Sequence, residues 1–278
     1  MQTSDFDYQL PPERIAQTSV KPRDRSRLLV LHRTTGDIEH RRFFEIETYL
    51  KPGDLLVMND SRVFKARLKA QIPSGDHATP TTIEIFLLRP HEKNWLCLAK
   101  PGKKLREGMI ISFTDTAKAT VKHKHLNGTI EIDFDATPEN VFALADRIGS
   151  IPTPPYVHQT PEHEQDYQTA YAKHTGSVAA PTAGFHFTPE LIERLKQKGV
   201  RFAFVTLHVG LGTFQPMKTE TLDEHVMHHE WINVPDETLK AIQETKAHGG
   251  RVIAVGTTTV RSLESPIQHG FTDRKSVV

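Results

Sequence analysis

Two segments in the second half of the sequence combine histidine with glycine and other small residues. The first, residues 176–188, reads GSVAAPTAGFHFT and leads directly into an expected helix. Such a loop exposes backbone N–H groups, and the helix end behind it favours a negatively charged ligand. We therefore predict that Thr182, Gly184 and His186 form part of a ligand site. A tight structural turn with a buried histidine is an alternative that this segment alone leaves open.

The second segment, residues 206–214, reads TLHVGLGTF and follows an apolar strand. In open α/β sheets, ligands bind beyond the carboxyl ends of the strands, which makes His208, Gly210, Gly212 and Thr213 candidates. The pair of glycines lacks the third glycine of the dinucleotide-binding fingerprint, so we do not interpret it as one. Because His208 lies inside an apolar strand, a hydrogen-bonded core histidine is the alternative.

A third segment, residues 225–230, reads HVMHHE and offers metal-ligating side chains. On a helix, His225 and His229 would share one face four residues apart, which is a spacing typical of metal ligands. Glu230 follows both histidines, so the order differs from the H-E-x-x-H motif. A metal-dependent hydrolase built on these three residues is the main alternative function, although surface clusters of histidine are common.

The fourth segment, residues 256–264, reads GTTTVRSLE and follows a short apolar strand. Thr257, Thr258 and Arg261 could hold a phosphate or carboxylate through charge-assisted hydrogen bonds at a helix N-terminus. The alternative is an ordinary helix start in which Arg261 pairs with Glu264.

Alternating strands and helices are expected to position these segments. The spacing predicts strands over 54–59, 200–209 and 251–255, and helices over 188–199 and 236–246. Thr188 and Pro189 are typical of a helix start, and Gly199 of a helix end. Nearer the N-terminus, a hairpin turns at 35–37 and a short helix covers 44–50. This alternation predicts an α/β layer.

Residues 67–149 differ, because short alternating segments follow one another with only one helix, at 141–148, which Gly149 ends. This pattern predicts a small antiparallel β-barrel, with strands near 82–88, 94–99, 109–113, 118–121 and 128–134. The predicted fold class is therefore α/β plus all-β. A discontinuous α/β domain, residues 1–66 and 150–278, carries an inserted β-barrel domain, residues 67–149.

Composition excludes several classes of protein. The 278 residues are 37% hydrophobic and 25% charged, the net charge is +1, and Cys97 is the only cysteine. No apolar run is long enough to cross a bilayer and no signal peptide is recognisable, so we expect a cytoplasmic protein without a membrane partner. Basic clusters at 21–27, 40–42, 62–69 and 100–106 could bind RNA phosphates if the fold gathers them, and a non-catalytic RNA-binding module is a second alternative.

The chain resembles the S-adenosylmethionine:tRNA ribosyltransferase-isomerases of queuosine biosynthesis. The resemblance begins at residues 5–17, continues through 23–31 and 52–63, and includes all four segments described above. It implies an α/β domain with a β-barrel insertion. It also implies a reaction in which the ribosyl part of S-adenosylmethionine moves to 7-aminomethyl-7-deazaguanine in the tRNA anticodon loop, giving epoxyqueuosine with release of adenine and methionine. No metal or tightly bound cofactor is implied, S-adenosylmethionine is a co-substrate, and we expect a monomer.

This chemistry requires a base and an acid. The sulfonium acidifies the neighbouring carbon, from which a base removes a proton, and an acid assists the departure of adenine. We assign His186 and His208 to this work, with His225 and Glu230 as alternates. Arg261 would hold the methionine carboxylate or an RNA phosphate. The sequence does not distinguish the base from the acid.

The similarity ends near Ser265, whereas members of the resembled family continue through further strands. Residues 273–278 read DRKSVV, which a common sequencing-adapter DNA encodes, and we interpret them as read-through of a truncated gene. We accordingly expect a C-terminally truncated protein in which the strand over 251–255 lacks neighbours. Re-sequencing the source locus tests this expectation.

Overall fold

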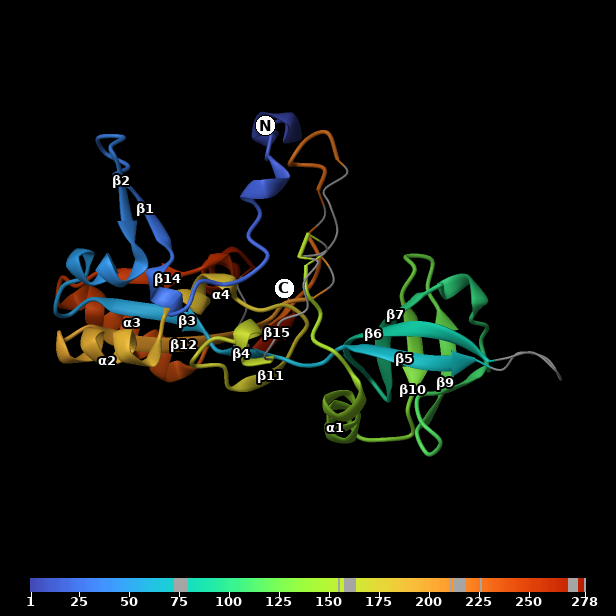
Figure 1. Ribbon diagram of the computed structural model, residues 1–278. Helices are drawn as coiled ribbons and strands as arrows, with labels where there is room; N and C mark the ends of the chain where they lie inside the picture. The colour runs from blue at the N-terminus through green and yellow to red at the C-terminus, as the bar shows by residue number, and fades with distance from the viewer. Residues whose placement is uncertain are drawn as a thin grey trace.

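The computed structural model describes residues 1–72, 80–154, 156–157, 164–210, 212, 219–225, 227–269 and 275–277, with the side chains of 266–269 and 275–277 left out. Figure 1 shows two bodies, an α/β layer and a separate small barrel joined to it by extended chain. The predicted fold class, α/β plus all-β, is confirmed. None of the helices in the described ranges has the length and apolar character needed to span a membrane.

A five-stranded mixed sheet forms the centre of the α/β body. Its order is β14 (Val252–Val255), β3 (Leu55–Asn59), β12 (Arg201–His208), β13 (Trp231–Asn233) and β15 (Lys275–Val277). The first three strands are parallel, whereas β13 and β15 pair antiparallel. The carboxyl ends of β14, β3 and β12 therefore meet at one edge of the sheet, where ligands of open α/β sheets bind.

Helices cover both faces of this sheet. Leu56 and Met58 of β3 pack against α2 (Pro189–Gln197), and the alternate residues Leu55 and Val57 pack against α3 (Asp236–Ala247) and α4 (Thr257–His269). All five residues of β3 are buried, as expected for a parallel strand covered on both faces. Thr188 caps α2 by accepting a hydrogen bond from the Leu191 backbone N–H at 3.2 Å, so the predicted helix start is confirmed.

The second body is a closed barrel of six antiparallel strands in the order β10-β7-β6-β5-β8-β9. The strands are β5 (Arg67–Ile72), β6 (Thr81–His91), β7 (Asn94–Lys100), β8 (Ile110–Ser112), β9 (Lys118–Lys124) and β10 (Ile130–Asp133). Helix α1 (Pro138–Ile148) follows and is ended by Gly149, as predicted. The predicted barrel is thus confirmed, while the exact domain boundaries at 66/67 and 149/150 stay a prediction.

The remaining elements are short. The predicted hairpin is formed by β1 (Arg27–Leu31) and β2 (Ile38–Arg42), which project from the α/β body in Figure 1. The predicted helix near 44–50 is a 3-10 helix, η4 (Phe43–Tyr49). Strand β4 (Ser61–Val63) pairs in parallel with β11 (His174–Ser177) next to the sheet edge. The other 3-10 helices are η1 (Thr3–Phe6), η2 (Pro12–Arg14), η3 (Arg23–Arg25), η5 (Gly102–Lys104), η6 (Glu164–Tyr167) and η7 (Thr182–His186).

An ion pair between a buried carboxylate, Asp54, and a half-exposed guanidinium, Arg251, anchors β3 at the edge opposite the ligand-binding edge. Asp54 is 2% exposed and accepts hydrogen bonds from Arg251 Nε at 3.0 Å and from the Lys51 backbone N–H at 2.7 Å. The hydrogen bonds from Arg251 hold the pKa of Asp54 below its ordinary value. A group with a lowered pKa stabilises the fold above its unfolded-state pKa, and this contribution is lost as the pH falls through the folded-state pKa.

Replacing Asp54 by asparagine should therefore lower the free energy of unfolding by about 2 kcal/mol at pH 7. The difference from wild type should shrink below about pH 4, where the wild-type carboxylate also takes up a proton. Denaturant unfolding of wild type and the Asp54→Asn variant at pH 7 and below about pH 4 measures this difference in the free energy of unfolding. Glu244→Gln is the control, because its ion pair with Arg201 lies on the surface, at 44% and 58% side-chain exposure, and should contribute under about 1 kcal/mol.

Candidate active site

Three of the four predicted segments meet at the carboxyl edge of the sheet. The Val178 backbone N–H donates to the Val209 carbonyl at 3.1 Å, and the Val209 N–H donates to Ser177 Oγ at 3.0 Å, which joins the first segment to the second. A Cβ built on Gly256 would lie 3.1 Å from the Cβ of Ala183, so the fourth segment also contacts the first. Segments that are distant in sequence are thus brought together where β12 and β14 end.

Glu230 connects the remaining segment to the others. Its carboxylate, on a residue only 8% exposed, accepts a hydrogen bond from the Gly210 backbone N–H at 3.0 Å. Its other oxygen accepts from Arg261 Nη1 at 2.6 Å, and Arg261 Nη2 donates to the His228 carbonyl at 2.6 Å. The structure therefore pairs Arg261 with Glu230, a contact that the helix-based alternative with Glu264 did not anticipate. This carboxylate and guanidinium fix the second, third and fourth segments relative to one another.

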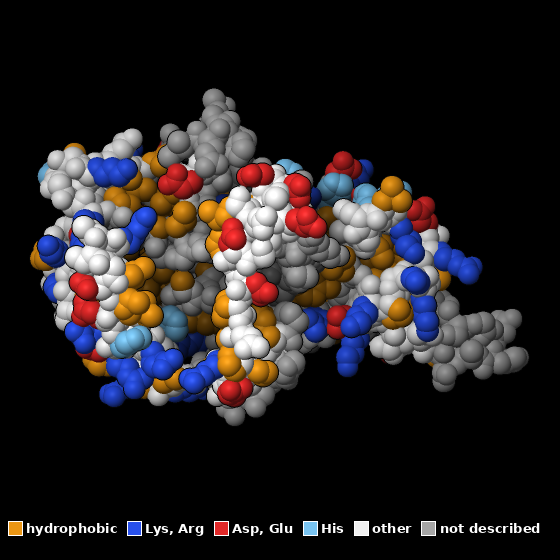
Figure 2. Space-filling view, turned by 90° about the horizontal axis from the view of Figure 1, so that it is seen from above, with side chains coloured by type: hydrophobic (Ala, Val, Ile, Leu, Met, Phe, Trp, Pro, Cys, Tyr) orange, Lys and Arg blue, Asp and Glu red, His pale blue; other side chains and the backbone are white. Residues whose placement is uncertain are grey.

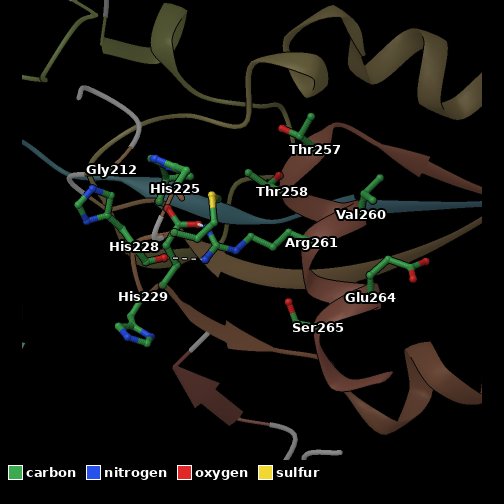
Figure 3. Close-up of a pocket in the computed structure, with 13 residues that line it drawn as sticks. Gly212, His225, His228, His229, Thr257, Thr258, Val260, Arg261, Glu264 and Ser265 are labelled. Carbon is green, nitrogen blue, oxygen red and sulfur yellow. Dashed lines mark hydrogen bonds and ion pairs between the residues drawn. The ribbon is translucent and has the colours of Figure 1, made fainter. Parts of the chain in front are cut away.

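A cavity of about 770 Å³ opens around this ion pair. Among the described residues, its lining is formed by Val209, Gly212, His225, Met227, His228, His229, Glu230, Thr257, Thr258, Val260, Arg261, Glu264 and Ser265. Figure 3 shows the Arg261 side chain reaching from α4 to the His228 segment, while the His229 imidazole points away from that contact. The cavity thus combines an apolar wall with a few polar groups, as small-molecule sites do.

The predicted site residues divide into two sets. Gly212, His225, Glu230, Thr257, Thr258 and Arg261 line the cavity. The other candidates, Thr182, Gly184, His186, His208 and Gly210, are not among the described lining residues, although Gly210 contacts the cavity through its hydrogen bond to Glu230. Thr213 lies outside the described residues.

The described residues do not form the arrangement that a metal-dependent hydrolase needs. That alternative placed His225 and His229 on one face of a helix, but residues 227–230 are not helical. Within the described ranges, no three histidine, cysteine, aspartate or glutamate side chains are arranged so that they could hold a metal ion. Glu230 instead interacts with Arg261, and a carboxylate in such an ion pair is a poor candidate for a metal ligand.

His208 is the last residue of β12 and lies in a tightly enclosed position. Its ring stacks on Trp231, with ring centroids 4.8 Å apart and planes inclined by 15°. Burial, followed by the charge of His174, lowers the pKa of His208 to about 4. The imidazole is therefore neutral at pH 7, where it can take part in hydrogen bonds but is only a weak base, since a general base works best with a pKa near the operating pH. Its Nδ1 atom is buried without a hydrogen-bond partner among the described residues.

Gly176 is the residue that makes room for the His208 ring. Its φ is +153°, and a Cβ built there would lie 2.6 Å from His208 Nε2. Replacing Gly176 by alanine should displace the imidazole and lower activity about 10²-fold, since a shift of about 1 Å at a reacting group can have that effect. Steady-state kinetics would measure the loss. Gly249→Ala is the control, because Gly249 also has a positive φ, +74°, but has no atom within 4 Å of a built Cβ.

His186 lies in η7, and its contacts are with residues that hold the fold together. Its ring is 5.0 Å from that of Phe43, and it interacts with the Arg23 backbone. Burial lowers the pKa of His186 as well. In the same 3-10 helix, Gly184 packs so closely on Tyr171 that a Cβ there would collide with the tyrosine hydroxyl. The roles of Thr182, Gly184 and His186 in binding or catalysis stay a prediction.

Two polar residues near His208, Asp60 and His174, were not predicted from the sequence as site residues. Asp60 directly follows β3 at the carboxyl edge of the sheet, and His174 begins β11 beside it, with 3.6 Å between Asp60 Oδ2 and His174 Nε2. The position of Asp60 was a usable signal, because polar residues at the carboxyl ends of parallel strands often belong to a site. His174 carried no comparable signal, since nothing in its neighbourhood marks a strand end.

The basic clusters take different roles in the structure. Arg23 donates to the backbone carbonyls of Gln165 and Gln168, and Arg41 pairs with Glu39, so these side chains have structural partners. Figure 2 shows Lys and Arg side chains gathered at one margin of the α/β body, beside a hollow with hydrophobic side chains, and a separate group over the barrel. A single continuous phosphate-binding stripe is not evident on this face.

Comparison with known proteins shows extensive similarity. A family model described as "Queuosine biosynthesis protein" matches residues 3–276. The S-adenosylmethionine:tRNA ribosyltransferase-isomerase of Thermotoga maritima is 50% identical over 266 residues, which cover 95% of this chain and 77% of the relative. The enzyme of the same name from Thermosipho africanus is 48% identical, covering 98% of this chain and 81% of the relative. A crystal structure of the Thermotoga maritima S-adenosylmethionine tRNA ribosyltransferase aligns over 95% of this chain and 73% of that chain, with 39% identity and a TM-score of 0.45.

Proposed function

Since this chain belongs to the queuosine biosynthesis protein family, whose matched relatives are S-adenosylmethionine:tRNA ribosyltransferase-isomerases, we propose that it catalyses their reaction. The ribosyl group of S-adenosylmethionine is transferred to 7-aminomethyl-7-deazaguanine in the anticodon loop of tRNA and isomerised. The products are epoxyqueuosine tRNA, adenine and methionine.

The single observation that carries this proposal at the level of the site is the position of Glu230. Its buried carboxylate lies in the wall of a cavity whose volume, about 770 Å³, suits a nucleoside-sized ligand. Glu230 and Arg261 together present fixed hydrogen-bonding groups at the cavity wall, which the polar atoms of S-adenosylmethionine can meet. We therefore place S-adenosylmethionine in this cavity.

The N-terminus of α4 supplies a complementary site for the methionine carboxylate. Thr257 and Thr258 begin this helix and line the cavity, and Thr258 Oγ1 is buried without a hydrogen-bond partner among the described residues. A helix N-terminus favours an anion, and an unsatisfied hydroxyl gains a hydrogen bond when a carboxylate arrives. In this arrangement Arg261 acts mainly by orienting Glu230, with its role toward the methionine carboxylate or an RNA phosphate as the alternative.

The proton transfers fall to the groups around the sheet edge. A base removes the proton from the carbon next to the sulfonium, and an acid protonates the departing adenine. His186 and His208 are the first candidates for these tasks, with His225 and Glu230 as alternates. We infer that the protein works in the cytoplasm, where its tRNA substrate is found, as a monomer and without a tightly bound cofactor.

Adenine release tests the proposal. Purified protein incubated with S-adenosylmethionine and precursor tRNA should release adenine, which chromatography would quantify. Omission of the tRNA, or use of tRNA with unmodified guanine at that position, should abolish the release. A protein that binds tRNA in a salt-dependent manner but releases no adenine would be the non-catalytic RNA-binding module instead.

A further inference from the structure

A polar cluster lies on the side of His208 that faces β4 and β11. It contains Asp60, which follows β3, His174, which begins β11, and Thr206 of β12. None of these residues is among the described residues that line the cavity around Glu230. The cluster nevertheless occupies the same carboxyl edge of the sheet, where ligands of this architecture bind.

Asp60 is held rigidly at the centre of the cluster. It is 7% exposed, and its Oδ1 accepts a hydrogen bond from Thr206 Oγ1 at 2.7 Å. Its backbone N–H donates to the Val205 carbonyl, and its own carbonyl accepts from the backbone N–H of Lys173 at 2.8 Å and of His174 at 3.3 Å. Both the side chain and the backbone of Asp60 are therefore fixed, and its free carboxylate oxygen, Oδ2, faces the His174 imidazole at 3.6 Å.

Burial of a carboxylate costs free energy unless hydrogen bonds or nearby charges compensate for it. Burial raises the pKa of Asp60, while Thr206, His174 and Lys173 oppose the rise. A carboxylate at ion-pair distance from an imidazole stabilises the imidazolium and favours a ring orientation in which one nitrogen faces the carboxylate. In this structure the facing nitrogen is Nε2, so Nδ1 is the atom of His174 that remains available for a proton.

His174 also lies next to His208. His174 and Gly176 both belong to β11, whose register shifts between Thr175 and Ser177, and a Cβ built on Gly176 would meet the His208 ring. The two rings lie close enough for the charge of His174 to contribute to the lowered pKa of His208. His174 keeps 49% of its side-chain surface exposed, so a substrate can reach it. The other ionisable groups around the pair are Lys173 and the buried Tyr171.

We propose that His174 is a further proton-transfer residue of the ribosyl transfer and that Asp60 is its positioning residue. This inference rests on the proposed function. Nδ1 of the neutral His174 imidazole takes the proton from the carbon next to the sulfonium, and the electron pair of the broken C–H bond stays on that carbon. His174 becomes an imidazolium stabilised by Asp60, and it gives the proton to adenine when the bond between adenine and ribose breaks. His208, stacked on Trp231, remains neutral throughout.

Two variants test the proposal in the adenine-release assay with precursor tRNA. His174→Ala, at an exposed side chain, should fold normally and lower kcat by about 10²-fold or more. Asp60→Asn keeps the acceptor for Thr206 but presents an amide to His174, and should lower kcat comparably while KM for S-adenosylmethionine changes little. His174→Ala should also lose the acidic limb of the pH dependence of kcat, and Asp60→Asn should shift this limb to lower pH, whereas a purely structural residue would leave it in place. Asp54→Asn, at the other end of β3, is the matched control, with lower stability and an unchanged pH profile.

The experiments distinguish failure of this inference from failure of the proposed function. Wild-type kcat and pH profile in His174→Ala would overturn the proposal, and so would an Asp60→Asn variant whose loss of activity simply follows its loss of folded protein. If the wild-type protein itself released no adenine with precursor tRNA, the proposed function would fail first and this inference with it. Wild-type activity combined with unaffected variants would refute this inference alone.

Discussion

Replacement of Glu230 by glutamine should lower kcat/KM for adenine release by about 10²-fold or more, the largest effect we expect from one substitution at the cavity. Glutamine can still accept the hydrogen bond from the Gly210 N–H. It cannot neutralise Arg261, whose guanidinium lies 2.6 Å from the wild-type carboxylate. Removing one partner of a buried pair leaves the other uncompensated, so a lower melting temperature should accompany the loss of activity.

Glu264→Gln is the matched control for this variant. Glu264 is on the same helix as Arg261 and also lines the cavity, but unlike Glu230 it is exposed. Its removal should change kcat/KM by less than about threefold, because exposed carboxylates interact weakly with distant charges. Equal effects of the two substitutions would show that the cavity needs only negative charge, and would contradict a specific role for the Glu230–Arg261 pair.

The second large effect is expected at His208. Replacing it by alanine should lower adenine release about 10²-fold, because the loss of the ring stacked on Trp231 should displace neighbouring groups at the sheet edge, whereas His186→Ala should lower it less. His186 packs against Phe43 and interacts with the Arg23 backbone, so its replacement should reduce stability more than turnover. Measuring adenine release by each variant in the same assay shows which of the two histidines contributes more to turnover. Near wild-type rates in both variants would contradict the assignment of these histidines to acid–base work.

His208 should also leave a signature in the dependence of stability on pH. Its pKa falls from 6.5 in the unfolded chain to about 4 in the folded protein, so the unfolded state takes up a proton first as the pH falls. Wild type should therefore lose stability between pH 6.5 and about 4, relative to a His208→Phe variant, which has no proton to take up. Denaturant unfolding across this range measures the difference, and parallel curves would argue against the buried neutral imidazole.

Local signals in the sequence were sufficient to predict most of the fold. Thr188 caps the start of α2, Gly199 follows its end with a positive φ, and the apolar residues between them recur at helical spacing, so α2 could be predicted closely. The short alternating strands of the barrel were equally recognisable, because each has turn residues on both sides. These features depend on neighbours within a few positions and need no tertiary information.

The pairing of polar groups across the site could not be predicted in the same way. Arg261 has a suitable partner three residues away in Glu264, yet the structure pairs it with Glu230, which belongs to a different segment. The contact between Asp60 and His174 depends on the parallel pairing of β4 with β11. The sequences of these two strands contain no signal that identifies them as partners. The four glycine- or histidine-containing segments could be identified one by one, but their distances and the roles of individual side chains follow only from the tertiary structure.

Mass analysis of the modified nucleoside tests the central claim most directly. After incubation with S-adenosylmethionine and tRNA bearing 7-aminomethyl-7-deazaguanine, the tRNA should be digested and its nucleosides identified. The claim predicts conversion of the precursor to epoxyqueuosine with adenine and methionine released in equal amounts, and conversion that fails in Glu230→Gln. An unchanged precursor in the presence of folded protein that binds the tRNA would contradict it.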